Sequence, residues 1–320
     1  MPYSGAIRFH LDFAGARSHN LIAGSERKRR PVPDARRSTG NPTVRRRELG
    51  ALLRGLRSGR GLTVDQVAVE LLCSPSKVSR METGQRGATL RDVRDLCELY
   101  GVTDEAEVAR LMDLARGGKE QGWWQPYDLE FSTYVGLEAE AVSTKYYQST
   151  VIPGLLQTAD YARAMHEVVI PKLDQARISE LVQVRLVRQQ LLQRNPPLAV
   201  SAIFDEAALH RVVGGPKVMQ AQLARLVELA ELANVTIRVI PFAVGAHFAM
   251  DSTFRILEFV KPVPDVVYVE GLVGFLYLDR AQDVARYEMI YESLVGFALD
   301  PKESIELITR IGAFYSNESI

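Results

Sequence analysis

Two side chains with metal-binding chemistry lie four residues apart in "FDEAALH", residues 204–210. On a helix Glu206 and His210 would share one face, a spacing that begins many metal sites. No third ligand stands at a motif spacing from them, and the two cysteines, Cys73 and Cys97, are wrongly spaced for a metal site. We therefore expect a side-chain pair of Glu206 with His210, two buried free thiols, no metal and no cofactor.

Motifs of the common catalytic sites are absent from the sequence. It contains no G-x-S-x-G, no H-E-x-x-H and no C-x-x-C, and the Gly-Gly pair at 214–215 lacks the rest of a GxxxxGK[ST] phosphate loop. We expect no catalytic residue and no enzymatic activity, and we interpret Tyr146, Tyr147 and Tyr161 as core and interface aromatics. His247 as a pocket residue and "IPGLLQT", residues 152–158, as the border of a ligand site remain alternatives to purely structural roles.

Polar residues suited to DNA gather in "LLCSPSKVSRMETGQRG", residues 71–87. Ser74 is a good helix N-cap, and Pro75 fits the first helical position. If Val78 and Met81 are buried, Ser76, Lys77, Ser79 and Arg80 face outward, where they can reach base edges and phosphates. The free N–H groups of a helix start also suit Ser74–Ser76 to a phosphate. The alternative is the polar outer face of an ordinary small helical bundle.

The charge distribution favours the same region. Formal net charge is zero, but residues 1–44 sum to +5 and residues 45–94 to +6, so the remaining 226 residues sum to −11. A basic front on an acidic body indicates a polyanionic partner for the front alone. Arg86 and Arg91 follow the polar helix, where the DNA backbone would continue.

Short helices must position these residues. Apolar spacing and caps predict helices over 44–58, 64–72, from Pro75 to the "TGQRG" segment, 90–100 and 104–115. Thr63 and Thr89 are expected caps, and Leu72 is expected to point inward with the apolar residues of its helix. The second and third helices, joined by a tight turn at Cys73–Ser74, form a helix-turn-helix.

The rest of the chain mixes helical and β-rich segments. Helices are expected over 157–168, 174–194, 217–233, 280–298 and 301–315, and strands at "YYQSTVI", "LAVSAIF", "VTIRVIPF", "STFRILEF", "DVVYVE" and "GFLYL". We predict a multidomain protein: an all-α, five-helix helix-turn-helix domain followed by an α+β domain with a mixed, partly antiparallel sheet. The expected divisions are a disordered basic tail (1–42), the DNA-binding domain (43–116), a connector sealed by Trp123 and Trp124 (117–126), and a sensing or interaction domain (127–320). The tail is interpreted as a solvated extension, with a DNA-phosphate arm and a later translation start as the alternatives.

The helical region resembles the Cro/phage-repressor type (XRE-like) helix-turn-helix over about 70 residues. Its pattern is met by Leu62, Ala68, Ser74, Val78, Ser79, Arg80, Glu82 and Gly84. The resemblance implies that Pro75, Ser76, Lys77 and Arg80 lie where the family contacts DNA. Val64 departs from the family by replacing a phosphate-binding glutamine, and Leu72 replaces the usual turn glycine, which implies a slightly altered turn. The predicted DNA-binding residues are thus Ser74, Pro75, Ser76, Lys77, Ser79, Arg80, Arg86 and Arg91.

The C-terminal region resembles a domain of unknown function in a large actinobacterial regulator family. The resemblance covers "GWW", "LEAEAV", "VIPGLLQTADYARAM", "VRLVRQQLL", "DVVYVEG" and the segment from "FDEAALH" to "VIPF". It implies an antitoxin-like transcriptional regulator for some members, with a small partner protein encoded by an adjacent gene.

No segment resembles a membrane span or a secretory signal, so we expect the protein in the cytoplasm. We also expect a homodimer, since helix-turn-helix proteins usually bind two half-sites. Three hypotheses of function follow. The first is a sequence-specific transcriptional regulator with an effector- or partner-binding domain, in which Ser76 and Arg80 read bases, Arg80 a guanine, and Lys77, Arg86 and Arg91 contact phosphates. The second is an antitoxin-like protein that mainly binds a small protein and uses DNA binding for autoregulation. The third is a small ligand in the α+β domain that shifts DNA binding.

Overall fold

The computed structural model describes residues 42–120, 122–127, 129, 131–169, 173–271 and 274–317. The predicted tail lies outside the described residues except for Pro42, which begins the first helix.

The N-terminal region folds into five helices, as the sequence predicts. They are α1 (Pro42–Gly59), α2 (Val64–Glu70), α3 (Pro75–Glu82), α4 (Leu90–Tyr100) and α5 (Glu105–Gly117). Thr63 and Thr89 each complete a capping box, and Ser74 accepts a hydrogen bond from the Lys77 N–H. Gly101 ends α4 in the left-handed conformation that glycine adopts without strain. Local capping therefore sets most of the boundaries read from the sequence.

One predicted helix end is wrong. The second helix stops at Glu70 rather than residue 72, and Leu72 has a positive φ of 49° and an almost fully exposed side chain. The expected inward position of Leu72 is therefore incorrect, and Cys73, also expected to be buried, is only partly buried, whereas Cys97 is buried as predicted. The turn keeps the left-handed geometry that a glycine would favour, and Leu72 adopts it at a steric cost.

The five helices share one apolar core. Its buried members include Leu49, Leu53, Val67, Ala68, Val78, Met81, Val93, Leu96, Cys97, Tyr100 and Leu111. Every residue predicted to be inward on the third and fourth helices belongs to this core. The core fixes which face of each short helix meets solvent.

The C-terminal region is α+β, as predicted. Its helices are α6 (Ser132–Glu140), α7 (Ala159–Val169), α8 (Gln175–Gln189), α9 (Glu206–His210), α10 (Pro216–Ala230), α11 (Ala281–Phe297) and α12 (Pro301–Asn317). Single 3₁₀ turns occupy η1 (Gln125–Tyr127), η2 (Gly154–Leu156), η3 (Gln190–Gln193) and η4 (Phe242–Val244). The strands are β1 (Ser143–Gln148), β2 (Ala199–Asp205), β3 (Val235–Ile240), β4 (Phe254–Glu258), β5 (Val266–Gly271) and β6 (Gly274–Leu278). Among these α-helices, α6 and α9 were absent from the predicted ranges, although the expected Glu206–His210 pair presupposed a helical turn at α9.

The described strands form one mixed sheet in the order β3-β2-β1-β4-β5-β6. Strands β1, β2 and β3 run parallel, and β4, β5 and β6 are joined antiparallel. The register places Tyr146 of β1 between Ala202 of β2 and Arg255 of β4. The centre of the sheet therefore carries polar and aromatic side chains together.

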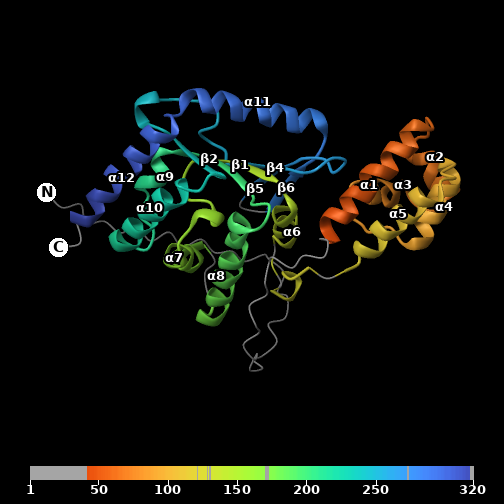
Figure 1. Cartoon of the computed structure of the whole chain (residues 1–320), viewed down its shortest axis with the longest axis horizontal. Coiled ribbons are helices and arrows are strands. Elements are labelled where there is room, and N and C mark those ends of the chain that lie inside the picture. The colour runs from red at the N-terminus through yellow and green to blue at the C-terminus, as the bar shows by residue number, and fades with distance from the viewer. Residues whose placement is uncertain are drawn as a thin grey trace, which may run out of the picture. The chain divides into compact units, whose positions relative to one another are not determined.

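Helices cover both faces of the sheet (Figure 1). On one face, α10 and α12 contribute Leu223, Leu226, Ile308 and Ile311 to the larger core. On the other, α11 packs Tyr291 and Leu294 against Tyr147, Ile203 and Ile256. Trp124 is buried with Tyr127 and Val135, which agrees with the connector tryptophan predicted to seal against this region.

No helix within the described ranges has the length and apolarity needed to cross a membrane.

Candidate nucleic-acid interface

Helix α3 presents a polar face to solvent. Val78 and Met81 are about 1–2% exposed, whereas Ser76, Ser79 and Arg80 are exposed. This division confirms the geometric expectation for those three outward residues. An exposed helix of eight residues with this chemistry suits the major groove.

Packing against α1 holds α3 in place. A Cβ on Gly50 of α1 would lie 2.5 Å from the carbonyl oxygens of Met81 and Glu82, so only glycine permits this close approach of the two helices. Glu82 is buried and accepts hydrogen bonds from Arg57 Nε at 2.6 Å and Nη2 at 3.0 Å. Arg57 also donates to the Leu62 carbonyl, so one guanidinium links α1, α3 and the loop before α2.

The start of α3 offers fewer free donors than the sequence suggested. Pro75 has no N–H, and the Ser74 hydroxyl accepts the Lys77 N–H at 3.2 Å. The hydroxyls of Ser74 and Ser76 lie 3.2 Å apart and share a hydrogen bond. In the described structure the Ser76 N–H remains for an anion at this end of the helix.

Arg80 is the long donor on this face. Its Nε donates to the Ser76 carbonyl at 3.1 Å, one turn earlier, which aligns the side chain along the helix. The two Nη groups have no ion-pair partner among the described residues. A guanidinium with a fixed stem and a free fork can bind two acceptors of one guanine.

Lys77 does not face freely outward, and that expectation is wrong. Its Nζ lies 2.6 Å from Asp92 Oδ1, and only 23% of the side chain is exposed. Burial by itself would raise the pKa of Asp92, but hydrogen bonds from Lys77 and Thr89 outweigh burial and hold that pKa below its usual value. The ammonium thus joins α3 to α4, because Asp92 is placed beside it by the capping box of α4.

Three exposed arginines continue the basic surface beyond α3. Arg86 is exposed, and Arg91 is 88% exposed with a loose Nε–Oδ2 contact of 3.6 Å to Asp95. Arg94, three residues after Arg91 on α4, is also exposed and was missed as a site residue. Its helical spacing from Arg91 was the signal that could have found it.

The two departures from the repressor pattern have structural consequences. Val64 is partly buried against the helical core and offers no polar contact. Gln66 bonds the Thr63 backbone N–H at 2.8 Å, so this glutamine completes the helix cap. Val64 therefore cannot supply the phosphate contact that the resemblance assigns to a glutamine at this position.

Two models of known protein families match this chain. Residues 48–111 match the family model described as a helix-turn-helix domain, and residues 131–310, more than half of the chain, match the model described as Domain of unknown function (DUF5753). The chain belongs to the DUF5753 family. Neither the curated proteins nor the solved structures yielded a match. The helix-turn-helix match supports DNA binding by α2 and α3, and the DUF5753 match leaves the role of the larger domain open.

Within the DUF5753 domain, the ionisable residues noted in the sequence have structural partners. His210 Nε2 and Glu206 Oε1 are 3.3 Å apart, which confirms the expected pair. Buried His247 has its Nε2 3.3 Å from Asp205 Oδ2. No group of three or more potential metal ligands occurs among the described residues. The predicted core tyrosines, Tyr146, Tyr147 and Tyr161, are all buried.

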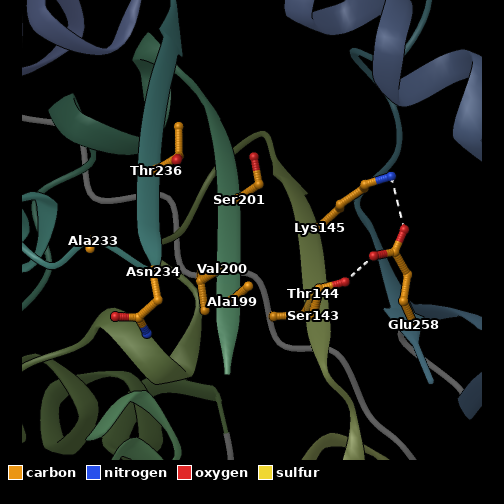
Figure 2. A pocket seen from close by; sticks show the side chains of 10 residues that line it. All are labelled: Ser143, Thr144, Lys145, Ala199, Val200, Ser201, Ala233, Asn234, Thr236 and Glu258. Atoms are coloured by element: carbon orange, nitrogen blue, oxygen red, sulfur yellow. Dashed lines mark hydrogen bonds and ion pairs between the residues drawn. The ribbon is translucent and has the colours of Figure 1, made fainter. Parts of the chain in front are cut away.

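The DUF5753 domain also has a cavity of about 190 Å³ at the amino ends of its parallel strands. Figure 2 shows Lys145 and Ser143 both turned toward Glu258, and Lys145 Nζ lies 3.0 Å from that carboxylate. Lys145 also pairs with Glu288 of α11 at 2.5 Å. Lys145 thus holds both carboxylates, and the buried hydroxyl of Thr144, which also lines the cavity, has no hydrogen-bond partner among the described residues.

Proposed function

We propose that this DUF5753 protein is a sequence-specific DNA-binding transcriptional regulator that acts without enzymatic activity. In this proposal α3 enters the major groove and Ser76 and Arg80 read base edges. Ser79, exposed on the same face of α3, contributes its hydroxyl to the DNA contact. Arg86 and Arg91, joined by Arg94, hold the phosphate backbone. Lys77 keeps α3 oriented through Asp92.

The observation that carries the proposal is the exposed, unpaired fork of Arg80 on a helix whose opposite side is fully buried. A surface arginine with its Nε fixed loses little entropy on binding. The sequence pattern and the fold of the five helices support assignment to the Cro/phage-repressor type, and the C-terminal resemblance supports an actinobacterial regulator family.

The active form we propose is a homodimer in the cytoplasm. One helix of eight residues covers only a few base pairs, and two half-sites related by a twofold axis multiply specificity. The predicted operator is therefore a palindrome with half-site centres about one helical turn apart, or a multiple of that spacing.

Selection of bound fragments from the organism's own DNA, with a salt titration of the strongest fragment, tests the proposal. The expected result is a palindromic consensus and an affinity that falls steeply with salt. Weak binding to all fragments, without a consensus, would refute sequence-specific regulation.

An alternative function is antitoxin-like binding of a small protein, with DNA binding for autoregulation. The net charge of −11 beyond residue 94 and exposed apolar side chains such as Met289 on α11 and Phe314 on α12 favour a protein partner. Co-purification with the product of the adjacent gene is the expected result. Failure of the two proteins to associate at micromolar concentrations would count against this alternative.

A further inference from the structure

Three arginines converge inside the DUF5753 domain. Arg188 of α8 makes a bidentate pair with Glu138, from Nε at 2.6 Å and from Nη2 at 2.9 Å, and both residues are buried. The guanidinium carbons of Arg188 and Arg255 lie 5.3 and 4.9 Å from the centre of the Tyr134 ring. Arg185 lies one turn before Arg188 on α8 and is close enough for both other arginines to lower its pKa.

The carboxylates in this cluster do not balance its positive charge. Glu138 neutralises Arg188, and Arg255 has a contact of 3.3 Å to Glu270, whose side chain is half exposed. Arg185 has no carboxylate partner among the described residues. Its Nη1 donates to the Gln157 side chain, and its Nε is buried without any partner. An uncompensated interior guanidinium is costly to the fold.

Arg185 and Arg255 lie deep in the domain and yet keep some contact with solvent. Burial is the largest single cause acting on the pKa of each. For Arg185, burial and the neighbouring arginines lower the pKa to about 9, whereas for Arg255 the nearby tyrosines and Glu270 outweigh burial and raise the pKa. Both residues nevertheless retain exposed surface, 16% of the side chain for Arg255. Both side chains are therefore partly accessible to a solute from the solvent.

A second unpartnered group is near enough to Arg185 for the charge of Arg185 to lower its pKa. His166 of α7 is 7% exposed, and its Nε2 has no hydrogen-bond partner in the described structure. Burial, followed by the charges of Arg185 and Arg188, lowers its pKa to about 4, so the imidazole is neutral at neutral pH. A neutral imidazole can donate one hydrogen bond to an anion.

The turn at Gly154 packs closely against Arg185. A Cβ on Gly154 would lie 3.4 Å from Arg185 Nε, in contact with the unpartnered atom. Gln189 donates to the carbonyls of Gly154 and Gln157 and so holds this turn against α8. Leu155 and Leu156 pack beneath it, as the sequence predicted for "IPGLLQT".

We propose that Arg185, assisted by Arg188, Arg255 and neutral His166, forms a binding site in the DUF5753 domain for a small-molecule anion, a carboxylate or a phosphate. The anion supplies the negative charge that the described cluster lacks, and the planar guanidinium suits either oxyanion. This site would make small anions the ligands of the DUF5753 domain. The inference does not depend on whether the protein binds DNA.

Thermal unfolding of the full chain without DNA tests the site. Sodium phosphate, sulfate, acetate and benzoate are titrated separately at constant ionic strength against sodium chloride. The expected result is a saturable rise of the unfolding midpoint with at least one of these anions. Comparison of phosphate and sulfate with the two carboxylates identifies the preferred group.

Arg185→Gln is the decisive variant. Its midpoint without anion is expected to equal or exceed that of the parent, because an unpaired interior charge is removed, and its apparent anion affinity is expected to fall at least tenfold. The matched control, Arg225→Gln, removes an arginine of α10 that pairs with Glu228 at 2.9 Å, and it should keep the parent's response. If Arg185→Gln does not fold, Arg185→Lys keeps the charge and should weaken binding through loss of the two-pronged geometry.

Three outcomes would overturn the site. They are the lack of a saturable response to all four anions in the parent, a full response in the Arg185 variant that folds, and an equal loss of response in Arg225→Gln.

Discussion

Glu82 at the end of α3 accepts two hydrogen bonds from the guanidinium of Arg57 on α1, at 2.6 and 3.0 Å. The carboxylate is 5% exposed, and the guanidinium is 15% exposed. The pair therefore fixes the proposed recognition helix to the first helix with directional bonds in a nearly dry environment.

Glu82→Ala should strongly destabilise the helix-turn-helix domain. Loss of the carboxylate leaves Arg57 charged and unpaired, which typically costs about 3 kcal/mol. Urea unfolding followed by circular dichroism measures the change. Arg54→Ala is the control, since its contact to Glu82 is 3.7 Å and the side chain is 42% exposed, so a loss below about 1 kcal/mol is expected. Equal effects of the two variants would contradict the structural role of the Arg57–Glu82 pair.

Arg80→Ala should weaken operator binding by about 1–3 kcal/mol and relax the preference at one position of each half-site. The reason is loss of the free guanidinium fork on α3. Fluorescence anisotropy with the selected operator and its single-base variants measures both effects. An Arg80→Ala protein that binds like the parent would remove Arg80 from the reading face.

Arg86→Gln and Lys77→Gln should differ in kind. Arg86 is exposed and should contact phosphate, so its loss should reduce the steepness of the log affinity against log salt plot by about 1. Lys77 is engaged with Asp92, so its loss should mainly lower the stability of α3 and α4, visible as faster amide hydrogen exchange. A large change of salt dependence for Lys77→Gln, with stability unchanged, would show that Lys77 contacts DNA instead.

Leu72→Gly should stabilise the helix-turn-helix domain. A left-handed conformation costs a non-glycine residue about 1–2 kcal/mol, which glycine would avoid. The greater conformational freedom of glycine in the unfolded chain offsets about 0.5–1 kcal/mol of this stabilisation. A net stabilisation of about 0.5–1 kcal/mol is expected in urea unfolding. Val69→Gly, at an exposed position inside α2, should instead destabilise the domain. Destabilisation by Leu72→Gly would contradict a strained left-handed backbone at Leu72.

The stability of the DUF5753 domain should fall as pH drops from about 6.5 toward 4. Burial, with the charges of Arg185 and Arg188, lowers the pKa of His166 to about 4 in the folded state from its ordinary value of 6.5, so the unfolded chain binds more protons between these values. The contribution of neutral His166 to the free energy of unfolding should be fully present above pH 7 and should fall by roughly 2 kcal/mol at pH 5. Urea unfolding at pH 7.5 and 5 should show this loss in the parent and a smaller loss in His166→Gln. Parallel pH curves for the two proteins would contradict a lowered pKa of His166.

Much of the fold follows from local sequence information. Caps such as Thr63, Ser74 and Thr89 satisfy free N–H groups within three residues, so helix starts can be read directly. Apolar runs likewise predict six strands, of which the first was expected at residues 146–152 but lies at 143–148, because the chain bends after Gln148. The predicted second helix was two residues too long because Leu72 is apolar and was expected to pack inward. In the structure the chain leaves the helix after Glu70, and the left-handed backbone at Leu72 turns this side chain to solvent.

The outward placement of Ser76, Ser79 and Arg80 was determined by the sequence alone, because the burial of Val78 and Met81 leaves a short helix only one free side. Only the tertiary structure decided the partners of the charges. Lys77 of α3 meets Asp92 of α4, and Glu138 of α6 meets Arg188 of α8 fifty residues away, because the packing of these helices sets those distances. The unpaired state of Arg185 depends on the same long-range packing, since a lone cation is recognised only after every nearby carboxylate has found its partner.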